Sequence, residues 1–327
     1  MKQKVILIFL TIIFISCKKD SDELTDRKDM DYKQKMRELV IGISQYAKSK
    51  NPDFNIVPQN GIELVTDNGD ESGTAHKEYL NAIDGNGQED LFYGYDDDDQ
   101  KSPAASTNYL KSFLNISKKA GKTILVTDYC STTSKVTDSY SQNANMGYIS
   151  FAANQRELNV IPKFPKPIQN ENSSVVTKFA QVKNFLYLIN PSGFAQKSDF
   201  INAVVKTNYD LLIMDLYFTD GSMFTAEEIN QLKSKANGGK RLIISYMSIG
   251  EAEDYRYYWN SSWKNNPPSW LDKENPSWEG NFKVKYWDPN WQQIIYGNDS
   301  SYLKKIVDAK FDGVYLDIID AFEYYEK

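Results

Sequence analysis

Acidic residues stand at the ends of several apolar runs of this sequence, where a strand would meet a loop. Asp215, Asp317 and Asp128 each end or closely follow such a run. Because side chains alternate between the two faces of a strand, Asp215 is expected on the face of Ile213 and Asp317 on the face of Tyr315. Two carboxyl groups that face one space can act as nucleophile and general acid. These residues are therefore candidates for catalysis.

Two further acids extend this set, since Glu251 follows the run 242–248 and Glu89 lies in the segment GQED. A single acid after a strand is as often a helix cap or a loop brace as a functional group. Five acids on one rim repel one another, which costs free energy unless the charges are used. The cluster as a whole is predicted to be functional.

Other catalytic chemistries find little support in the composition. His76 is the only histidine and Cys130 is the only cysteine after Cys17, which disfavours a zinc site and Ser-His-Asp or Cys-His catalysis. The run from Asp96 to Asp99 could hold calcium, but a solvated loop is the favoured interpretation. We expect no cofactor and no metal.

Eight short apolar or alternating runs are predicted to be strands that position these acids. Helical patterns separate several of them, so parallel βαβ units are expected, closed into an eight-stranded (β/α)8 barrel of the TIM type. Active sites of such barrels lie at the carboxyl ends of the strands. The runs are residues 54–57, 80–83, 123–127, 148–152, 185–189, 211–216, 242–247 and 314–318.

Helical spacing and capping residues mark the elements between the strands. A helix is expected at 32–49, and Ser106, Thr225 with Glu228, and Asp299 are expected to cap three others. A helix thus precedes the first strand, and no room is left for one after the last. This order predicts a circularly permuted barrel in which the first and last strands pair in parallel.

The N-terminus has the pattern of an export signal. Lys2 and Lys4 precede an apolar run at 5–15, and Phe14-Ile15-Ser16-Cys17 resembles a bacterial lipobox. We expect a signal peptide at 1–17 lipidated at Cys17, a flexible tether at 18–31 and a single domain at 32–327. The protein is predicted to be an exported monomer, lipid-anchored to the bacterial cell envelope.

Composition restricts the ligand. The chain of 327 residues is 13% aromatic with 22 Tyr, which suits stacking on sugars, and its net charge of −6 disfavours nucleic acid. Aromatic, acidic and proline residues are dense at 246–291, a long excursion after one strand that is typical of a binding wall. A neutral or cationic ligand is expected.

Several long segments resemble glycoside hydrolase family 114, the endo-α-1,4-polygalactosaminidases, and within it a subgroup of secreted bacterial and archaeal proteins. The segments are PQNGIEL from Pro58, DGNGQEDLFY from Asp84, VTDYC from Val126, YMSIGEAEDYRYYW from Tyr246, KYWDPNW from Lys285 and GVYLDIIDAFEYY from Gly313. In the usual family order PQNG and GQEDLFY follow GVYLD, which agrees with the permutation.

The resemblance implies two catalytic carboxylates. Asp317 corresponds to the family's nucleophile and Glu89 to its acid/base, although the family's glutamate typically follows Asn and here follows Gln88. Binding positions implied by the resemblance, together with the strand-end Asp128, are Asp215, Tyr246, Glu251, Asp320, Gln59 and Asn60.

The function expected from this pattern is endo-acting, retaining hydrolysis of an α-linked amino-sugar polysaccharide. Two alternatives stay open at this point: a surface glycan-binding lipoprotein with little turnover, and a hydrolase of a different glycan. The expected partners are a polysaccharide and, only through the lipid anchor, a membrane.

Overall fold

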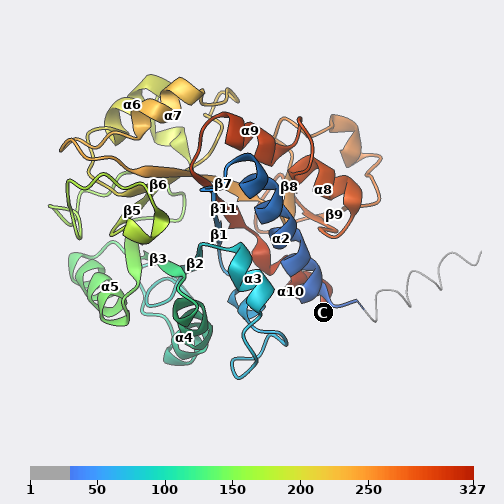
Figure 1. The fold of residues 1–327 in the computed structure, drawn as a ribbon, viewed down its shortest axis with the longest axis horizontal. Helices are drawn as coiled ribbons and strands as arrows, with labels where there is room; N and C mark the ends of the chain where they lie inside the picture. The colour runs from blue at the N-terminus through green and yellow to red at the C-terminus, as the bar shows by residue number, and fades with distance from the viewer. Residues whose placement is uncertain (1–29) are drawn as a thin grey trace, which may run out of the picture.

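The computed structural model describes residues 30–327 as a mixed α/β fold (Figure 1). The predicted signal peptide, the lipidation at Cys17 and nearly all of the predicted tether lie outside the described residues. Within 30–327, no helix combines the length and the apolar character needed to cross a membrane. The described residues therefore include the whole of the single domain predicted at 32–327.

Eight parallel strands form the centre of the fold, as expected. They are hydrogen-bonded in two sheets, whose orders are β1-β11-β7-β6-β5 and β2-β3-β4. The strands are β1 (Asn55–Pro58), β2 (Gly85–Glu89), β3 (Thr123–Tyr129), β4 (Ile149–Ala153), β5 (Phe185–Tyr187), β6 (Leu211–Met214), β7 (Leu242–Ser248) and β11 (Gly313–Asp317).

The two sheets meet at both of their edges. Next to β1 and β2, Gln59 and Gly87 form a parallel bridge, and the amide of Asn60 donates to the Gly87 carbonyl at 2.9 Å. Across β4 and β5, the rings of Phe151 and Phe185 are 5.7 Å apart. The parallel α/β architecture is thus confirmed, whereas a single closed ladder is not formed and full barrel closure stays a prediction.

The predicted pairing of the first and last strands is confirmed. Ile56 of β1 lies opposite Val314 of β11, in parallel. Helix α2 (Tyr32–Lys50), capped by Asp31, packs against α9 (Tyr302–Asp308) and α3 (Lys77–Ala82) and so fills the place beside β11 that a final helix would take (Figure 1). The circular permutation relative to the family order stays a prediction.

The strand predicted at 80–83 is wrong, because those residues end helix α3 (Lys77–Ala82) and the strand β2 follows at 85–89. The sequence of β2 is GNGQE, which has no apolar residue, so a hydrophobic pattern could not reveal it. Gly87 is required there because a side chain would collide with the Tyr315 hydroxyl. Glu89 becomes the last residue of a strand.

The remaining helices surround the sheets. Thr225 and Glu228 form the predicted capping box of α7, but α4 is capped at Pro103 rather than Ser106 and α9 at Ser301 rather than Asp299. The helices are α4 (Ala104–Lys119), α5 (Thr133–Met146), α6 (Lys197–Val204), α7 (Ala226–Leu232), α8 (Pro289–Ile295), α9 (Tyr302–Asp308) and α10 (Phe322–Tyr325). The 3-10 turns are η1 (Ile62–Val65), η2 (Phe179–Gln181), η3 (Pro191–Gly193), η4 (Ser261–Lys264) and η5 (Ile319–Ala321).

The excursion after β7 folds as a small antiparallel sheet with the order β8-β10-β9. Its strands are β8 (Glu251–Glu253), β9 (Leu271–Glu274) and β10 (Asn281–Val284). Trp270 and Trp291 are buried with their tilted rings 5.1 Å apart, and the Trp291 indole donates to the Ile249 carbonyl at 2.9 Å. Part of the aromatic excess is therefore the core of this sheet and not a sugar-binding wall.

Candidate active site

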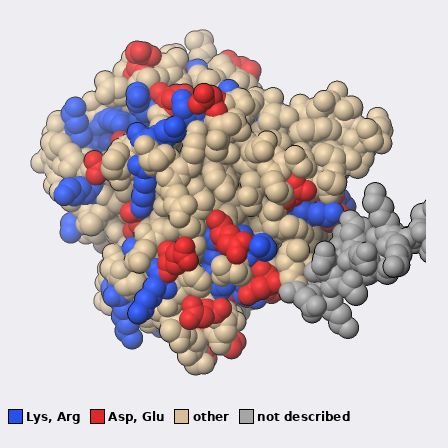
Figure 2. Space-filling view, turned by 45° about the vertical axis from the view of Figure 1, so that its right-hand side comes forward, with Lys and Arg blue, Asp and Glu red and all other residues tan. Residues whose placement is uncertain are grey.

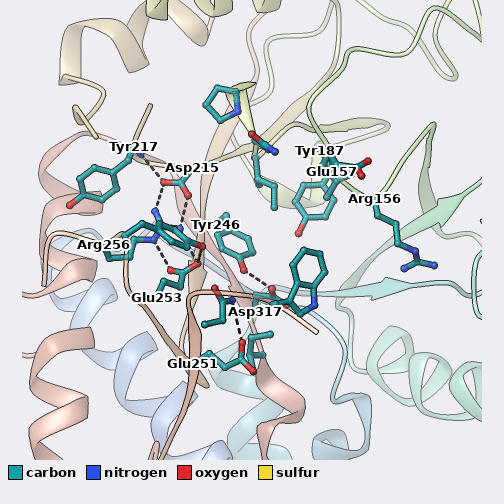
Figure 3. Close-up of a pocket in the computed structure, with 18 of the residues that line it drawn as sticks. Arg156, Glu157, Tyr187, Asp215, Tyr217, Tyr246, Glu251, Glu253, Arg256 and Asp317 are labelled. Atoms are coloured by element: carbon teal, nitrogen blue, oxygen red, sulfur yellow. Dashed lines mark hydrogen bonds and ion pairs between the residues drawn. The ribbon is translucent and has the colours of Figure 1, made fainter. Parts of the chain in front are cut away.

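A cavity of about 1120 Å³ opens at the carboxyl ends of the strands. Eight of the nine predicted catalytic and binding residues line it, and Figure 3 shows several of them pointing into one space. They are Gln59, Asn60, Glu89, Asp215, Tyr246, Glu251, Asp317 and Asp320. The exception is Asp128.

Asp317 is the last residue of β11 and points into the cavity. One carboxylate oxygen accepts from the Tyr246 hydroxyl at 2.7 Å (Figure 3). The other accepts from the Gln59 amide at 3.1 Å. Burial raises the pKa of this carboxyl to about 6, partly opposed by the bond from Tyr246. At neutral pH Asp317 is therefore ionised, as a nucleophile must be.

Glu89 is the last residue of β2 and faces the same space. Its Oε2 accepts from the amides of Gln59 at 2.8 Å and Asn60 at 3.0 Å, and its Oε1 accepts from the Tyr129 hydroxyl. Burial raises the pKa of Glu89, and the charge of Asp317 raises it further. These two effects favour a proton on Glu89, as a general acid requires.

Gln59 joins the two carboxyl groups. Its amide nitrogen donates to Glu89 Oε2 and to Asp317 Oδ1, so those two oxygens lie no farther apart than the two bonds laid end to end, about 6 Å. The Tyr187 hydroxyl donates to the Gln59 carbonyl oxygen at 2.9 Å, which fixes the orientation of the amide. Gln59, which follows β1, thus links Asp317 at the end of β11 to Glu89 at the end of β2.

Asp128 is not on the cavity wall, so the structure does not support its predicted binding role. It is fully buried and accepts from the backbone amides of Phe92 and Tyr93, from the Ser139 hydroxyl and from the Asn143 amide. It therefore braces the loop after β2 against α5. The reason is strand length: β3 continues to Tyr129, so Tyr129 faces the cavity and Asp128 faces the helices.

Asp215 lies in a charge-compensated network that the sequence did not predict. Arg256 binds both of its oxygens, at 2.9 and 2.7 Å, and also binds Glu253 at 2.6 Å (Figure 3). All three side chains are largely buried. Because its charge is neutralised, Asp215 is better suited to shaping the cavity or binding a hydroxyl group than to attacking carbon.

Glu251 and Asp320 occupy the side of the cavity nearest the small antiparallel sheet. Glu251 accepts from Lys283 at 2.5 Å and from Asn275 at 2.8 Å. For Asp320, burial and the charge of Glu323 raise the pKa to about 6. Asp320 forms none of the ion pairs seen among the described residues, so its charge is available to a ligand.

Two further residues that line the cavity, Arg156 and Trp278, are not among the predicted site residues. The guanidinium of Arg156 lies 4.2 Å over the Tyr129 ring and pairs with Asp90 at 2.9 Å and Asp98 at 2.7 Å. At the rim, Trp278 lines the cavity and is 60% exposed. No local pattern marks Arg156, whereas Trp278 lies within the aromatic-rich excursion that the sequence predicts to be a binding wall.

No three His, Cys, Asp or Glu side chains gather into a metal site anywhere in residues 30–327. In the acidic run 96–99, Asp98 is paired with Arg156, and Asp99 accepts from the amides of Ser131 and Thr132 at the start of α5. These two acids therefore have contacts within the chain that hold the loop.

A cavity with paired carboxyl groups at the ends of parallel strands suits the cleavage of glycosidic bonds. In agreement, residues 166–327 match the model of glycoside-hydrolase family GH114. The match includes Asp317, Asp215, Tyr246, Glu251 and Asp320, and it supports glycoside hydrolase activity. Glu89, Gln59 and Asn60 lie outside it.

Three similar proteins, each described as uncharacterized, come from distant organisms. The chain is 42% identical over 158 residues to a protein of Methanocaldococcus jannaschii, covering 47% of this chain and 42% of that protein. For a Thermotoga maritima protein the identity is 37%, covering 45% and 42%. For a Deinococcus radiodurans protein it is 40%, covering 38% of each. The chain thus spans about two fifths of the length of these curated relatives.

Proposed function

We propose that this protein cleaves α-linked amino-sugar polysaccharide within the chain, with retention of anomeric configuration. Asp317 is the nucleophile and Glu89 the acid/base. The observation that carries the proposal is the single Gln59 amide bonded to both carboxyl groups. Because of this shared donor, Glu89 Oε2 and Asp317 Oδ1 lie at most about 6 Å apart. This distance favours retention, in which the two carboxyl groups stand about 5–5.5 Å apart, over inversion, in which they stand about 6.5–9.5 Å apart.

The reaction follows in two steps. The Asp317 carboxylate attacks the anomeric carbon while Glu89 gives its proton to the departing glycosidic oxygen, which leaves a glycosyl ester on Asp317. Glu89, now ionised, takes a proton from water, and the resulting hydroxide displaces Asp317 from the sugar. The Tyr246 hydroxyl, which donates to Asp317, holds the nucleophile in position between the steps.

The substrate class is supported by the charge and the rim of the cavity. Asp215 and Glu251 are paired with cations, but Asp320 is not, and its carboxylate suits the ammonium group of an amino sugar. Trp278 offers an exposed ring on which a sugar can stack. The same features suit a deacetylated polymer better than a fully acetylated one.

We also propose that Cys17 is lipidated and anchors a monomeric enzyme to the cell envelope. The basis is the apolar run 5–15 that ends in Phe14-Ile15-Ser16-Cys17. The expected result is that the protein partitions with membranes and that Cys17→Ser releases it. Undiminished partitioning of the variant would refute the anchor.

Activity is tested by incubating the protein with deacetylated and acetylated galactosaminan and measuring new reducing ends. We expect internal cleavage of the deacetylated polymer and none by Asp317→Asn. Tight binding without cleavage by the unmodified protein would favour the glycan-binding alternative. Cleavage of another glycan alone would retain the mechanism and replace the substrate.

A further inference from the structure

The face opposite the cavity carries exposed lysines in most of the segments that enter the strands. Because the eight strands are parallel, their amino-terminal ends lie together on that face. We call it the lysine face, and it is defined by exposed lysines in the segments leading into β1, β3, β5, β6, β7 and β11. These lysines are Lys50, Lys118, Lys119, Lys178, Lys183, Lys206, Lys240 and Lys310.

None of these eight lysines takes part in the ion pairs found in residues 30–327. The less exposed lysines nearby do: Lys48 pairs with Asp84, Lys233 with Asp312 and Lys235 with Asp210. Acids in the same segments therefore neutralise inner lysines and leave the outer ones uncompensated. The exposed acids without an ion pair there are only Asp53 and Glu171 among the described residues.

The opposite, cavity-bearing face is acidic. The segments that leave the strands contain the acidic run 96–99 and the cavity acids, so the charge of the molecule is divided between its two ends. Figure 2 shows one side of the molecule, on which Lys and Arg side chains gather toward the left margin. A net charge of −6 therefore conceals a strongly cationic face.

We propose that the lysine face docks on an anionic lipid surface. The eight lysines are distributed over six connections around the strands rather than along one groove, a layout that fits a plane of phosphate headgroups better than a linear polyanion. Docking in this way turns the cavity away from the lipid and leaves it open to polymer. The surface would add a second, electrostatic signal to a lipid anchor.

The first residue of α2 lies at the end of that helix that is farther from the lysine face. The segment between Cys17 and α2 is nevertheless long enough to permit this orientation. The 19 residues of α2 span about 28 Å. The 13 residues that follow Cys17, up to Met30, have a contour length of at most about 43 Å. An anchor at Cys17 can thus reach a membrane that lies against the lysine face.

Vesicle flotation tests the proposal, using the full chain with Cys17→Ser so that no acyl group contributes. The probes are vesicles of phosphatidylcholine alone and of phosphatidylcholine with phosphatidylglycerol. The test variant carries Lys118→Gln, Lys119→Gln, Lys206→Gln and Lys240→Gln. The matched control carries Lys101→Gln, Lys264→Gln, Lys273→Gln and Lys327→Gln, which remove the same charge from exposed sites outside the lysine face.

We expect binding to anionic vesicles to fall about tenfold or more in the test variant and less than about twofold in the control, with both folded by circular dichroism. Raised salt should weaken the binding of the unmodified protein. Equal losses in the two variants, or equal binding to neutral and anionic vesicles, would overturn the proposal. Binding to heparin but not to anionic vesicles would also overturn it, in favour of a soluble polyanion. None of these outcomes depends on glycosidase activity.

Discussion

The two halves of the chain contribute different parts of the same cavity. Residues 166–327, which match family GH114, supply Asp317, the Tyr246 hydroxyl bonded to it, and the Arg256 network. Residues 30–165, outside the match, supply Glu89 and the amide of Gln59. The proposed nucleophile and its charge environment thus come from one half, and the proposed acid and its hydrogen-bond donors come from the other. Neither half holds a complete site.

The largest effect is expected from the half that matches the family. Asp317→Asn removes the nucleophile but little volume, so turnover should fall on the order of 10⁵-fold while glycan affinity is kept. Burial raises the pKa of Asp317 to about 6, above its unfolded value, so ionisation of this group lowers stability as pH rises through about 4 to 6.

The Asn variant should therefore be more stable than the parent at pH 7, by on the order of 2 kcal/mol. Reducing-end assays and urea unfolding at pH 7 check the two parts. Near-normal activity in Asp317→Asn would transfer the nucleophile's role to Asp215 or Asp320.

The other half is tested through its acid. Glu89→Gln cannot protonate the leaving oxygen, so cleavage of polymer should fall about 10²- to 10⁴-fold. Substrates with an activated leaving group need no proton and should keep most of their rate for the first step. Pre-steady-state release of the leaving group, which reports the first step alone, measures the contrast with both substrate types. Equal losses on both would mean that Glu89 is not the acid.

The charge network of the matched half should matter to stability. Arg256→Gln leaves Asp215 and Glu253 buried without a countercharge, which should lower the free energy of unfolding by about 3–5 kcal/mol. The control is Lys304→Gln, because its pair with Asp308 is exposed and should cost less than about 1 kcal/mol. Urea unfolding measures both. Similar small losses would show that the network contributes little.

The smallest effects are expected from two amide donors of residues 30–165. One of them bonds to an acid of each half, and the other bonds only to the acid of its own half. Gln59 donates to Asp317 and Glu89, whereas Asn60 donates only to Glu89. Loss of a donor to a carboxylate raises its pKa. Gln59→Ala should therefore raise the apparent pKa of both limbs of the pH profile of kcat/KM and lower the rate about tenfold. Asn60→Ala should raise the apparent pKa of the upper limb alone. Identical pH profiles of kcat/KM for the two variants would show that Gln59 does not bridge the two acids.

The sequence predicts the matched half more completely than the other. Asp317 is identifiable because GVYLD alternates and ends on an acid. The strand that carries Glu89 is not predictable in this way, since GNGQE offers no apolar pattern. A strand that ends at 127, as the apolar run predicts, leaves Asp128 free to face the cavity, but β3 continues for two more residues, and alternation then turns Tyr129 to the cavity and Asp128 to the helices. The pairing of Asp215 with Arg256 joins distant segments and leaves no local signal.

The most direct test of the shared site is to trap the glycosyl ester. In Glu89→Gln, an activated substrate still forms the intermediate, but no base helps water to remove it, so the ester should accumulate. Rapid acid quenching, proteolysis and mass spectrometry then locate the sugar. We expect one added glycosyl group on the peptide that contains Asp317, at the Asp317 carboxyl. Label on Asp215 or Asp320, or none despite turnover, would contradict it.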